Sequence, residues 1–472
     1  MKILPPEIEI DLYEEGFGED DLLQRKKTGA ALSDLLNRID DPLTVAVDGQ
    51  WGTGKTYFLK RWVGEHRNAN GEKPIVVYFD AFQNDYLGEP LFALISALEE
   101  RVAALGKGGG PIEKLKEVSL RLRPWVKPLI RAALAAAGAS AVTAAFDELA
   151  KARDTEKGCK DSSSDFWGEE RARRIALEEF RQALQSLAVS SEETGENGDE
   201  SSRVIIVIDE LDRCRPDYAL EVLEIVKHLF SVPRLHFVLG VNLNALENMV
   251  RARYGQKSDA QAYLRKFIQV TLDLPNEIGP SHHPAQKAVL LYLNRLLEYM
   301  EIPEHINDYL RRHVKIVSRS NRISLRDVEN IVSIVSLADI EYLKNQRILP
   351  GWAIAATDLI VSKVVRNDLY SKFLNATISD SELKSYLSIT DNMLEEQLEN
   401  GKHNPDFDYE ARFIFYIWLC ISGNKENRTL EPAVQAELYR VFDTFGSELN
   451  LQKIPMEVYR QRLNRFRFFN DQ

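Results

Sequence analysis

The chain has 472 residues, about three times the common domain size of roughly 150. Hydrophobic residues make up 44% and aromatic residues 9%, so real cores can form, which excludes a disordered chain, a collagen-like protein and a disulfide scaffold. The net charge of −12 excludes a generic nucleic-acid coat, although it leaves room for a local basic groove.

The cysteines and histidines indicate a protein without a metal cluster. Cys159, Cys214 and Cys420 lie far apart, which is typical of reduced thiols in a cytosol. His282 and His283 have no other ligand-type neighbours in the sequence. The N-terminus lacks the apolar segment of a signal peptide, and we therefore expect a cytoplasmic protein.

Apolar patterning predicts an alternation of helices and strands. We expect a helix over 20–39, where leucines recur at near-helical spacing. Continuous apolar runs predict strands at 43–48, 75–80, 204–208, 235–241 and 267–272. Helical periodicity predicts helices from Lys55 onward and over 91–102, 219–230 and 245–254. Such buried strands between helices are typical of a parallel sheet covered on both faces.

A phosphate-binding loop follows the first strand. Residues 49–56, GQWGTGKT, fit G-x-x-x-x-G-K-[ST] in full, with a strand before and a helix after. Glycines let backbone N–H groups turn toward phosphate oxygens, and the helix N-terminus adds its positive end. The residues expected at the nucleotide are Gly49, Gln50, Trp51, Gly52, Thr53, Gly54, Lys55 and Thr56. We expect Lys55 to reach the β- and γ-phosphates and Thr56 to bind Mg²⁺.

Two acidic residues, Asp209 and Glu210, follow the strand 204–208. In phosphate-loop enzymes an Asp at this place holds Mg²⁺ through water, and an adjacent Glu polarises the attacking water. Asp212 comes next and would support the metal or nucleotide indirectly. Arg213 would pair with Asp212 or meet a neighbour, and a structural role is equally compatible with either residue.

These motifs together resemble the KAP family of P-loop NTPases over about residues 25–340. The resemblance rests on Trp51-Gly52 inside the loop, on the run 209–213 (DELDR), and on 263–275. Two positions depart from the family: Asp80-Ala81-Phe82 stands where Asn-Ala-Trp is frequent, and Glu210 where Asp is common. The resemblance implies an additional-strand ATPase core and ATP rather than GTP, and we find no Asn-Lys-x-Asp guanine motif.

Three further residues are candidates by position. Asn242, after the strand 235–241, is similar to a sensor of the γ-phosphate or the water, although Asn is often only a turn former. In ring-forming ATPases that resemble this chain, an arginine before the last core strand reaches the neighbouring subunit; here that is Arg265, with Lys266 as the fallback. Arg326 resembles the arginine in the helical lid of related ATPases. For Arg265 and Arg326 alike, the alternative is an ordinary surface arginine with no role at the nucleotide.

The predicted organisation is a P-loop core with helical additions. We expect a helical lead-in (1–40), the core (41–105 and 203–280), a mostly helical insertion (106–202), a helical lid (281–345) and an α-helical C-terminal domain (346–472). The alanine-rich run 129–146 is too short and too weakly apolar to favour a membrane helix over a packed one. The aromatic stretch 413–419 predicts core. The arginine-aromatic stretch 459–469 suits nucleic acid, or a helix that covers its own domain.

The sequence therefore predicts an ATPase that binds and hydrolyses Mg-ATP to switch or assemble a protein complex, as a homo-oligomer with protein partners. By analogy, the resemblance to bacterial KAP proteins tied to phage or plasmid exclusion implies a role in antiphage defence. Two alternatives stay open: an ATP-regulated scaffold with little turnover, and a DNA-dependent motor. Glu210 favours hydrolysis over the scaffold, and the acidic charge disfavours the motor.

Overall fold

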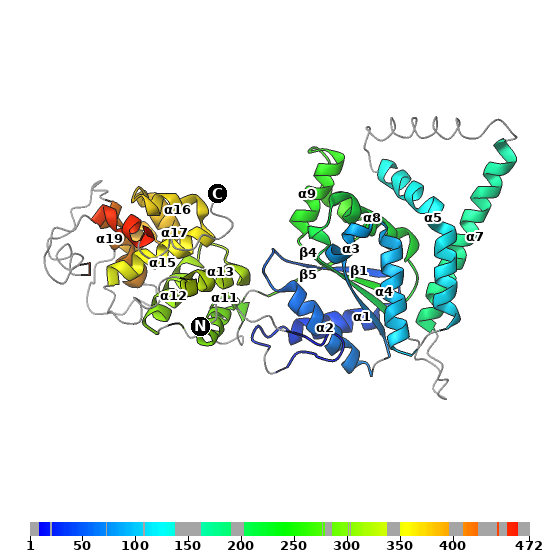
Figure 1. The fold of residues 1–472 in the computed structure, drawn as a ribbon, viewed down its shortest axis with the longest axis horizontal. Coiled ribbons are helices and arrows are strands. Elements are labelled where there is room, and N and C mark those ends of the chain that lie inside the picture. The colour runs from blue at the N-terminus through cyan, green and yellow to red at the C-terminus, as the bar shows by residue number, and fades with distance from the viewer. Residues whose placement is uncertain are drawn as a thin grey trace. The chain divides into compact units, whose positions relative to one another are not determined.

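The computed structural model describes residues 9–18, 21–71, 73–106, 109–136, 162–189, 203–275, 277–278, 286–300, 302, 304–337, 350–395, 409–422, 441–442 and 451–460. They belong to two compact units, and the boundary between the units follows Pro275. Figure 1 shows an α/β unit up to Pro275 and an almost wholly helical one after it.

A five-stranded parallel sheet forms the centre of the first unit. Its strands are β1 (Leu43–Asp48), β2 (Ile75–Asp80), β3 (Val204–Asp209), β4 (Leu235–Val241) and β5 (Val270–Asp273). Their order is β2-β3-β4-β1-β5, and every neighbouring pair is parallel. Strand β4 thus stands between the strand before the phosphate loop and the strand before the acids. This additional strand confirms the predicted fold class.

Helices cover both faces of this sheet (Figure 1). They are α1 (Lys26–Arg38), α2 (Lys55–Ala69), α3 (Ala81–Asn84), α4 (Pro90–Ala104), α5 (Gly110–Ala136), α7 (Ser162–Val189), α8 (Pro216–Leu229), α9 (Leu243–Tyr254) and α10 (Ala260–Leu264). Two 3₁₀ turns, η1 (Asp85–Leu87) and η2 (Leu211–Arg213), follow β2 and β3 closely.

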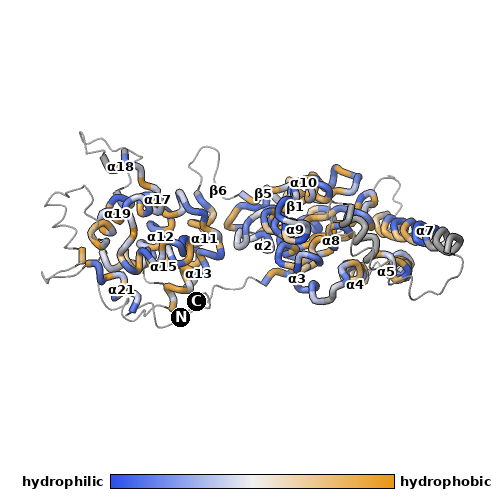
Figure 2. Tube along the Cα trace, turned by 90° about the horizontal axis from the view of Figure 1, so that it is seen from above, coloured by the Kyte–Doolittle hydropathy of each residue, from blue (hydrophilic) through white to orange (hydrophobic). Residues whose placement is uncertain are grey.

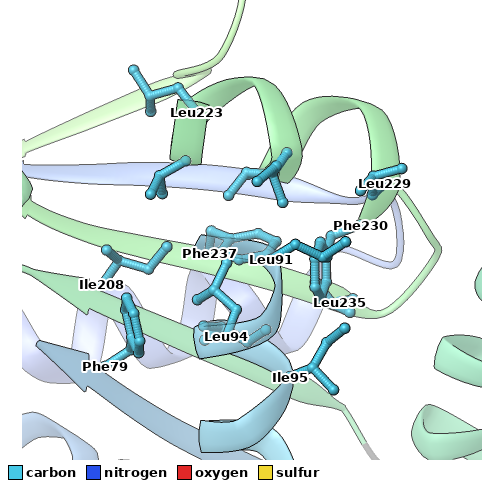
Figure 3. Packing of buried hydrophobic residues seen from close by; sticks show 14 of the residues in the cluster. Phe79, Leu91, Leu94, Ile95, Ile208, Leu223, Leu229, Phe230, Leu235 and Phe237 are labelled. Carbon is cyan, nitrogen blue, oxygen red and sulfur yellow. The ribbon is translucent and has the colours of Figure 1, made fainter. Parts of the chain in front are cut away.

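Strand side chains alternate between two buried clusters, as the period of two along a strand requires. Val76, Ile205 and Val207 pack with the α1 and α2 side, where Phe58 and Trp62 are fully buried. The residues between them face α4 and α8; Figure 3 shows Phe79, Ile208 and Phe237 against Leu91, Leu94 and Leu223. Both faces are therefore sealed from water, which explains why these strands are apolar throughout.

The described part of the insertion is helical, as expected. Helices α5 and α7 pack along each other, and Phe180 of α7 meets Phe230 after α8 edge-on, with ring centroids 5.5 Å apart. Both polar and apolar residues occur along α7 (Figure 2), and its buried residues recur at helical spacing, as in an amphipathic helix: Ala176, Phe180, Ala183, Leu184, Leu187 and Ala188. No helix among the described residues is long and apolar enough to cross a membrane. Residues 137–146 of the alanine-rich run lie outside the described part.

Several predicted boundaries differ from the structure; α8, for example, begins at Pro216 rather than 219. Two of the differences have a clear local reason. Helix α1 begins at Lys26, because the Asp21 carboxylate accepts the N–H groups of Arg25 and Lys26 and the backbone at Gln24 is left-handed, with φ 50°. Strand β5 begins at Val270 rather than 267. Phe267 and Ile268 instead turn back with their N–H groups on the carbonyl of Leu264, and both are buried.

Where the structure describes the second unit, it is helical apart from one short antiparallel pair, β6 (Glu277–Ile278) with β7 (Gln286–Lys287), which the sequence did not predict. Its helices are α11 (Ala288–Tyr299), α12 (Glu304–Val317), α13 (Leu325–Leu337), α15 (Pro350–Val365), α16 (Asn367–Leu374), α17 (Asp380–Leu387), α18 (Asp391–Glu395), α19 (Tyr409–Ser422) and α21 (Ile454–Val458), with a 3₁₀ turn η3 (Leu451–Lys453). Phe415, Ile417 and Trp418 of α19 are fully buried, which confirms the predicted core stretch. Residues 461–469 lie outside the described part.

Candidate functional site

The site residues gather where β1, β3 and β4 end. Strand register pairs Asp48 with Val241 and Asp209 with Gly240, so the phosphate loop, the acidic pair and Asn242 share the carboxyl edge of the sheet. The Gly49 N–H donates to the carbonyl of Val241 at 3.2 Å, which ties the start of the loop to β4. This edge, at a change of strand order, is where parallel α/β sheets place their ligands.

The loop requires glycine at specific positions. Gly52 and Gly54 both have φ 82°, a left-handed conformation that other residues adopt only with strain. At Gly49 a Cβ atom would lie 2.8 Å from the Thr53 hydroxyl, and that hydroxyl donates to the carbonyl of Gln50 at 2.8 Å. The loop is thus a tight cradle that a side chain at Gly49 would fill, and α2 starts directly after it.

Lys55 folds back over this cradle. Its Nζ donates to the carbonyls of Gly49 at 2.5 Å and Gln50 at 3.2 Å. Burial lowers the pKa of Lys55, while the carboxylates of Asp212 and Asp209 act in the opposite direction. The ammonium therefore sits between the loop carbonyls and the acidic edge, which is where a phosphate-binding cation is needed.

Asp209 is the most deeply placed acid of the site, with 1% of its surface exposed. It accepts hydrogen bonds from the Tyr78 hydroxyl at 2.8 Å and from the Glu210 N–H at 2.9 Å, and the Thr56 hydroxyl lies close enough to lower its pKa. Burial raises the pKa of Asp209, and these three groups oppose that rise. A Cβ at Gly240 would lie 2.4 Å from Oδ1, so glycine in β4 makes room for this carboxylate.

The oxygen pair Thr56–Asp209 suits Mg²⁺. Mg²⁺ prefers oxygen ligands and commonly takes only one or two from protein, completing its shell with phosphates and water. Within the described ranges no group of three or more His, Cys, Asp or Glu is placed to hold a metal. A hydroxyl near one buried carboxylate, beside a phosphate cradle, fits a metal that arrives together with its nucleotide.

Glu210 sits in a constrained turn directly after β3. Its backbone has φ 58°, and its Oε1 pairs with Nη2 of Arg213 at 3.0 Å. Burial raises the pKa of Glu210; Arg213 acts against that rise, while Asp209, Asp80 and Asp212 reinforce it. Arg213 thus takes Glu210 as its partner, where the sequence had suggested Asp212 or a neighbour.

Asp212 is joined to the phosphate loop instead. Its Oδ2 accepts the indole N–H of Trp51 at 2.6 Å, although the Trp51 side chain is 51% exposed and Asp212 only 3%. One bond therefore connects the loop after β1 to the turn after β3. The bond joins a residue from each of two motifs on which the family resemblance rests, Trp51-Gly52 and the run 209–213.

The model of the KAP family P-loop domain matches residues 25–340 of this chain. The chain belongs to the KAP family of P-loop NTPases. Membership in this family implies that the chain binds a nucleoside triphosphate together with Mg²⁺. No curated protein sequence matches this KAP chain as a relative.

Several solved structures are distantly similar to this KAP protein. The Aeropyrum pernix ORC2 protein in its ADPNP-ADP complexes is 15% identical, covers 78% of this chain and 83% of its own, and has a TM-score of 0.33. Cdc6p from Pyrobaculum aerophilum is 11% identical over 78% and 89% of the two chains, with a TM-score of 0.33. The replication initiator DnaA bound to AMPPCP and single-stranded DNA is 11% identical over 91% and 95%, with a TM-score of 0.27.

The structure brings Asn242 to this KAP site and places Arg265 away from it within the same unit. Asn242 caps α9, and its Oδ1 accepts the Ala245 N–H at 3.4 Å. Arg265 is exposed at the end of α10; four residues on, the Gln269 N–H donates to Thr44 at the start of β1. A strand rises about 3.3 Å per residue, so Thr44 is roughly 16 Å from Gly49 along β1. Arg265 precedes the residue that meets Thr44, and it therefore lies at the edge of the sheet opposite the phosphate loop. Arg326 is exposed on α13 of the second unit.

Sequence reasoning missed three contributors to the KAP site: Tyr78, Arg25 and the Trp51–Asp212 bond. Tyr78 had a signal, because it is a polar-tipped residue within the apolar run 75–79, two residues before the strand ends at Asp80. Arg25 had none, since it precedes the loop by a whole helix and a strand. Its guanidinium nevertheless bonds the loop carbonyls of Thr53 and Gly54.

Proposed function

We propose that this KAP protein is an ATPase that binds Mg-ATP at residues 49–56 and hydrolyses it to switch or assemble a protein complex. The observation that carries the proposal is the shared carboxyl edge of the sheet, where Asp48 before the loop pairs with Val241 and Asp209 pairs with Gly240, and where the Thr56 hydroxyl acts on the Asp209 carboxylate. It brings the two motifs of an NTPase to one point, with Glu210 next in the chain.

Each residue has a role that its surroundings support. Lys55 would neutralise the β- and γ-phosphates, since its ammonium already lies over the loop. Thr56 directly and Asp209 through water would hold Mg²⁺, which supplies positive charge between the phosphate oxygens. Glu210 would polarise the attacking water, and a raised pKa suits a carboxylate that accepts a proton. Asn242, beside them at the sheet edge, would orient that water or the γ-phosphate.

We further propose a homo-oligomer in which Arg265 completes the site of the next subunit. Its guanidinium is exposed and lies at the edge opposite its own phosphate loop. This position supports action in trans rather than in cis. A guanidinium that reaches the γ-phosphate stabilises charge in the transition state and raises turnover by roughly 10³–10⁵.

The biological role that we propose is antiphage defence in a bacterial cell, with protein partners. It rests on the resemblance to KAP proteins tied to phage or plasmid exclusion, which is an analogy of family and not of chemistry. Two other functions compete with it: a scaffold that binds ATP with little turnover, and a DNA-dependent motor. The placement of Glu210 beside the metal ligand favours an enzyme over the scaffold.

Phosphate release from ATP by the full chain separates these functions. The ATPase predicts Mg²⁺-dependent release that Lys55→Ala abolishes together with ATP binding. Lys257→Ala removes an exposed lysine in the loop after α9 and serves as the matched control, with unchanged release. Binding without release identifies the scaffold, and strong stimulation by DNA identifies the motor. The defence role is tested by counting phage plaques on bacterial cells. It predicts that the wild type reduces plaque formation and that Lys55→Ala does not.

A further inference from the structure

Arg25 is a charged residue buried against the outside of the phosphate loop. It lies immediately before α1 and has 1% of its surface exposed. Its Nη2 donates to the carbonyl of Thr53 at 2.7 Å, and its Nη1 donates to the carbonyl of Gly54 at 2.9 Å. The planar fork of one guanidinium therefore grips two consecutive peptide groups of the loop.

Fixing those carbonyls also fixes the N–H groups on the same peptides. A trans peptide is planar, and its C=O and N–H point in opposite directions. The carbonyl of Thr53 shares its peptide with the N–H of Gly54, and the carbonyl of Gly54 shares its peptide with the N–H of Lys55. Because α2 begins at Lys55, that N–H has no acceptor within the helix. Both N–H groups are thus turned away from Arg25, toward the phosphate side of the loop.

Arg25 is itself held in place. Its backbone N–H donates to the Asp21 carboxylate at 3.0 Å, and the next N–H, of Lys26, donates to the same carboxylate at 2.9 Å. Burial lowers the pKa of Arg25 to about 10, with Asp21 acting against that change, so the guanidinium stays charged at neutral pH. Burying a charge costs free energy that an apolar side chain would avoid, so stability alone is a poor reason for arginine here.

We propose that Arg25 is a positioning residue of the phosphate loop, which orients the N–H groups of Gly54 and Lys55 for the phosphates of ATP. The inference rests on the proposed function for the identity of the ligand. It adds a residue that lies outside the loop motif and precedes it by a helix and a strand. Arg25 does not touch the nucleotide in this account; it acts through the backbone that does.

Arg67 provides a matched control for a purely structural arginine. It is also buried, with 8% exposed, and Nη1 donates to the carbonyl of Tyr13 and the carboxylate of Glu14, both at 2.7 Å. Like Arg25, it ties the N-terminal segment to the body of the unit. Unlike Arg25, it bonds Tyr13 and Glu14 near the start of the unit. Arg25→Met and Arg67→Met each remove a buried guanidinium, and only the first takes donors from the loop: Thr53 loses its bond to Arg25, while the Gly54 carbonyl keeps the Phe58 N–H of α2 at 3.0 Å.

The experiment measures ATP and ADP affinity of the full chain by calorimetry, at a temperature where circular dichroism shows each variant folded. Arg25→Met is expected to bind both nucleotides roughly 10- to 100-fold more weakly, since hydrogen bonds from a charged group are lost. The KM for ATP should rise by a similar factor with kcat little changed, because the cradle contacts the ground state and the transition state alike. Arg67→Met should bind within about twofold of the wild type.

Each outcome decides the inference. Wild-type affinity in folded Arg25→Met overturns it, and so does an equal loss in Arg67→Met. If Arg25→Met does not fold, Arg25→Lys replaces it: an ammonium lacks the rigid fork, so weakened binding supports the inference and wild-type affinity overturns it. Failure of the wild type to bind ATP would instead refute the proposed function. Wild-type binding that Lys55→Ala abolishes and Arg25→Met leaves intact would refute the role of Arg25 alone.

Discussion

Replacing Tyr78 with Phe removes a single hydroxyl from the site and tests whether Asp209 holds the metal. The Tyr78 hydroxyl donates to Asp209 at 2.8 Å, and Asp209 is 1% exposed, so water cannot replace the lost bond easily. A hydrogen bond to a charged group is worth about 1.5–3 kcal/mol, and each 1.4 kcal/mol is a factor of ten. We therefore expect Tyr78→Phe to need roughly 10- to 100-fold more Mg²⁺ for half-maximal phosphate release.

The same substitution should change the pH profile in a fixed direction. Burial raises the pKa of Asp209, and the Tyr78 hydroxyl opposes that rise, so its removal raises the pKa further. The metal needs the ionised carboxylate. Activity should therefore be lost as pH falls, and in Tyr78→Phe the loss should begin at higher pH than in the wild type.

Tyr292→Phe is the matched control, because its hydroxyl donates to Oε1 of Glu329 at 2.6 Å between two helices of the second unit. It makes the same chemical change at a different phenol–carboxylate pair and should leave the Mg²⁺ requirement unaltered. An unchanged Mg²⁺ requirement and an unchanged acidic limb in Tyr78→Phe would refute the assignment of the metal to Asp209.

Three further predictions concern assembly, pH stability and the link between the motifs. Arg265→Ala should bind ATP without hydrolysing it, and mixing it with Lys55→Ala should restore part of the activity, because each chain supplies what the other lacks. Burial and Arg203 lower the pKa of His236 to about 4. Neutral His236 therefore contributes fully to stability above about pH 6.5, the ordinary pKa of histidine, and this contribution is lost as the pH falls toward 4. His236→Leu should reduce the decrease in unfolding free energy over this pH range by roughly 3 kcal/mol, measured by urea unfolding. Trp51→Phe should destabilise the first unit by about 1–3 kcal/mol in the same assay, because the buried carboxylate of Asp212 loses a donor.

Each of these three has a distinct contrary result. Turnover that is independent of protein concentration, with no recovery on mixing, would exclude action of Arg265 in trans. Parallel stability curves for the wild type and His236→Leu across the acidic range would show that His236 is not the titrating group. Unaltered unfolding of Trp51→Phe would mean that the Trp51–Asp212 bond adds nothing to the folded state.

The sheet and the two motifs could be predicted because their signals are local. Runs such as 204–208 are sealed on both faces and are therefore apolar throughout, and the loop 49–56 needs glycine where φ is positive. The pairing of Glu210 with Arg213 was also within reach, since residues three apart meet across a single turn. The start of β5 was not, because Phe267 and Ile268 are apolar through burial at a turn rather than in a strand.

Contacts between distant parts of the chain could not be predicted from local pattern. Arg25 reaches the carbonyls of Thr53 and Gly54 only because α1 packs on α2, and no spacing in the sequence encodes that approach. The hydroxyl of Tyr78 reaches Asp209 only because β2 pairs with β3 in register. Such links depend on strand order, which periodicity along one strand does not specify.

Single-turnover hydrolysis of Mg-ATP by Glu210→Gln, beside the wild type, tests the central claim most directly. An amide cannot accept a proton from water as a carboxylate does, and such a general base contributes roughly 10²–10⁴ in rate. We expect the variant to bind ATP as the wild type does and to hydrolyse it at least about 100-fold more slowly. Equal turnover in the two proteins, or bound ATP that the wild type itself leaves intact, would contradict an ATPase that works through Glu210.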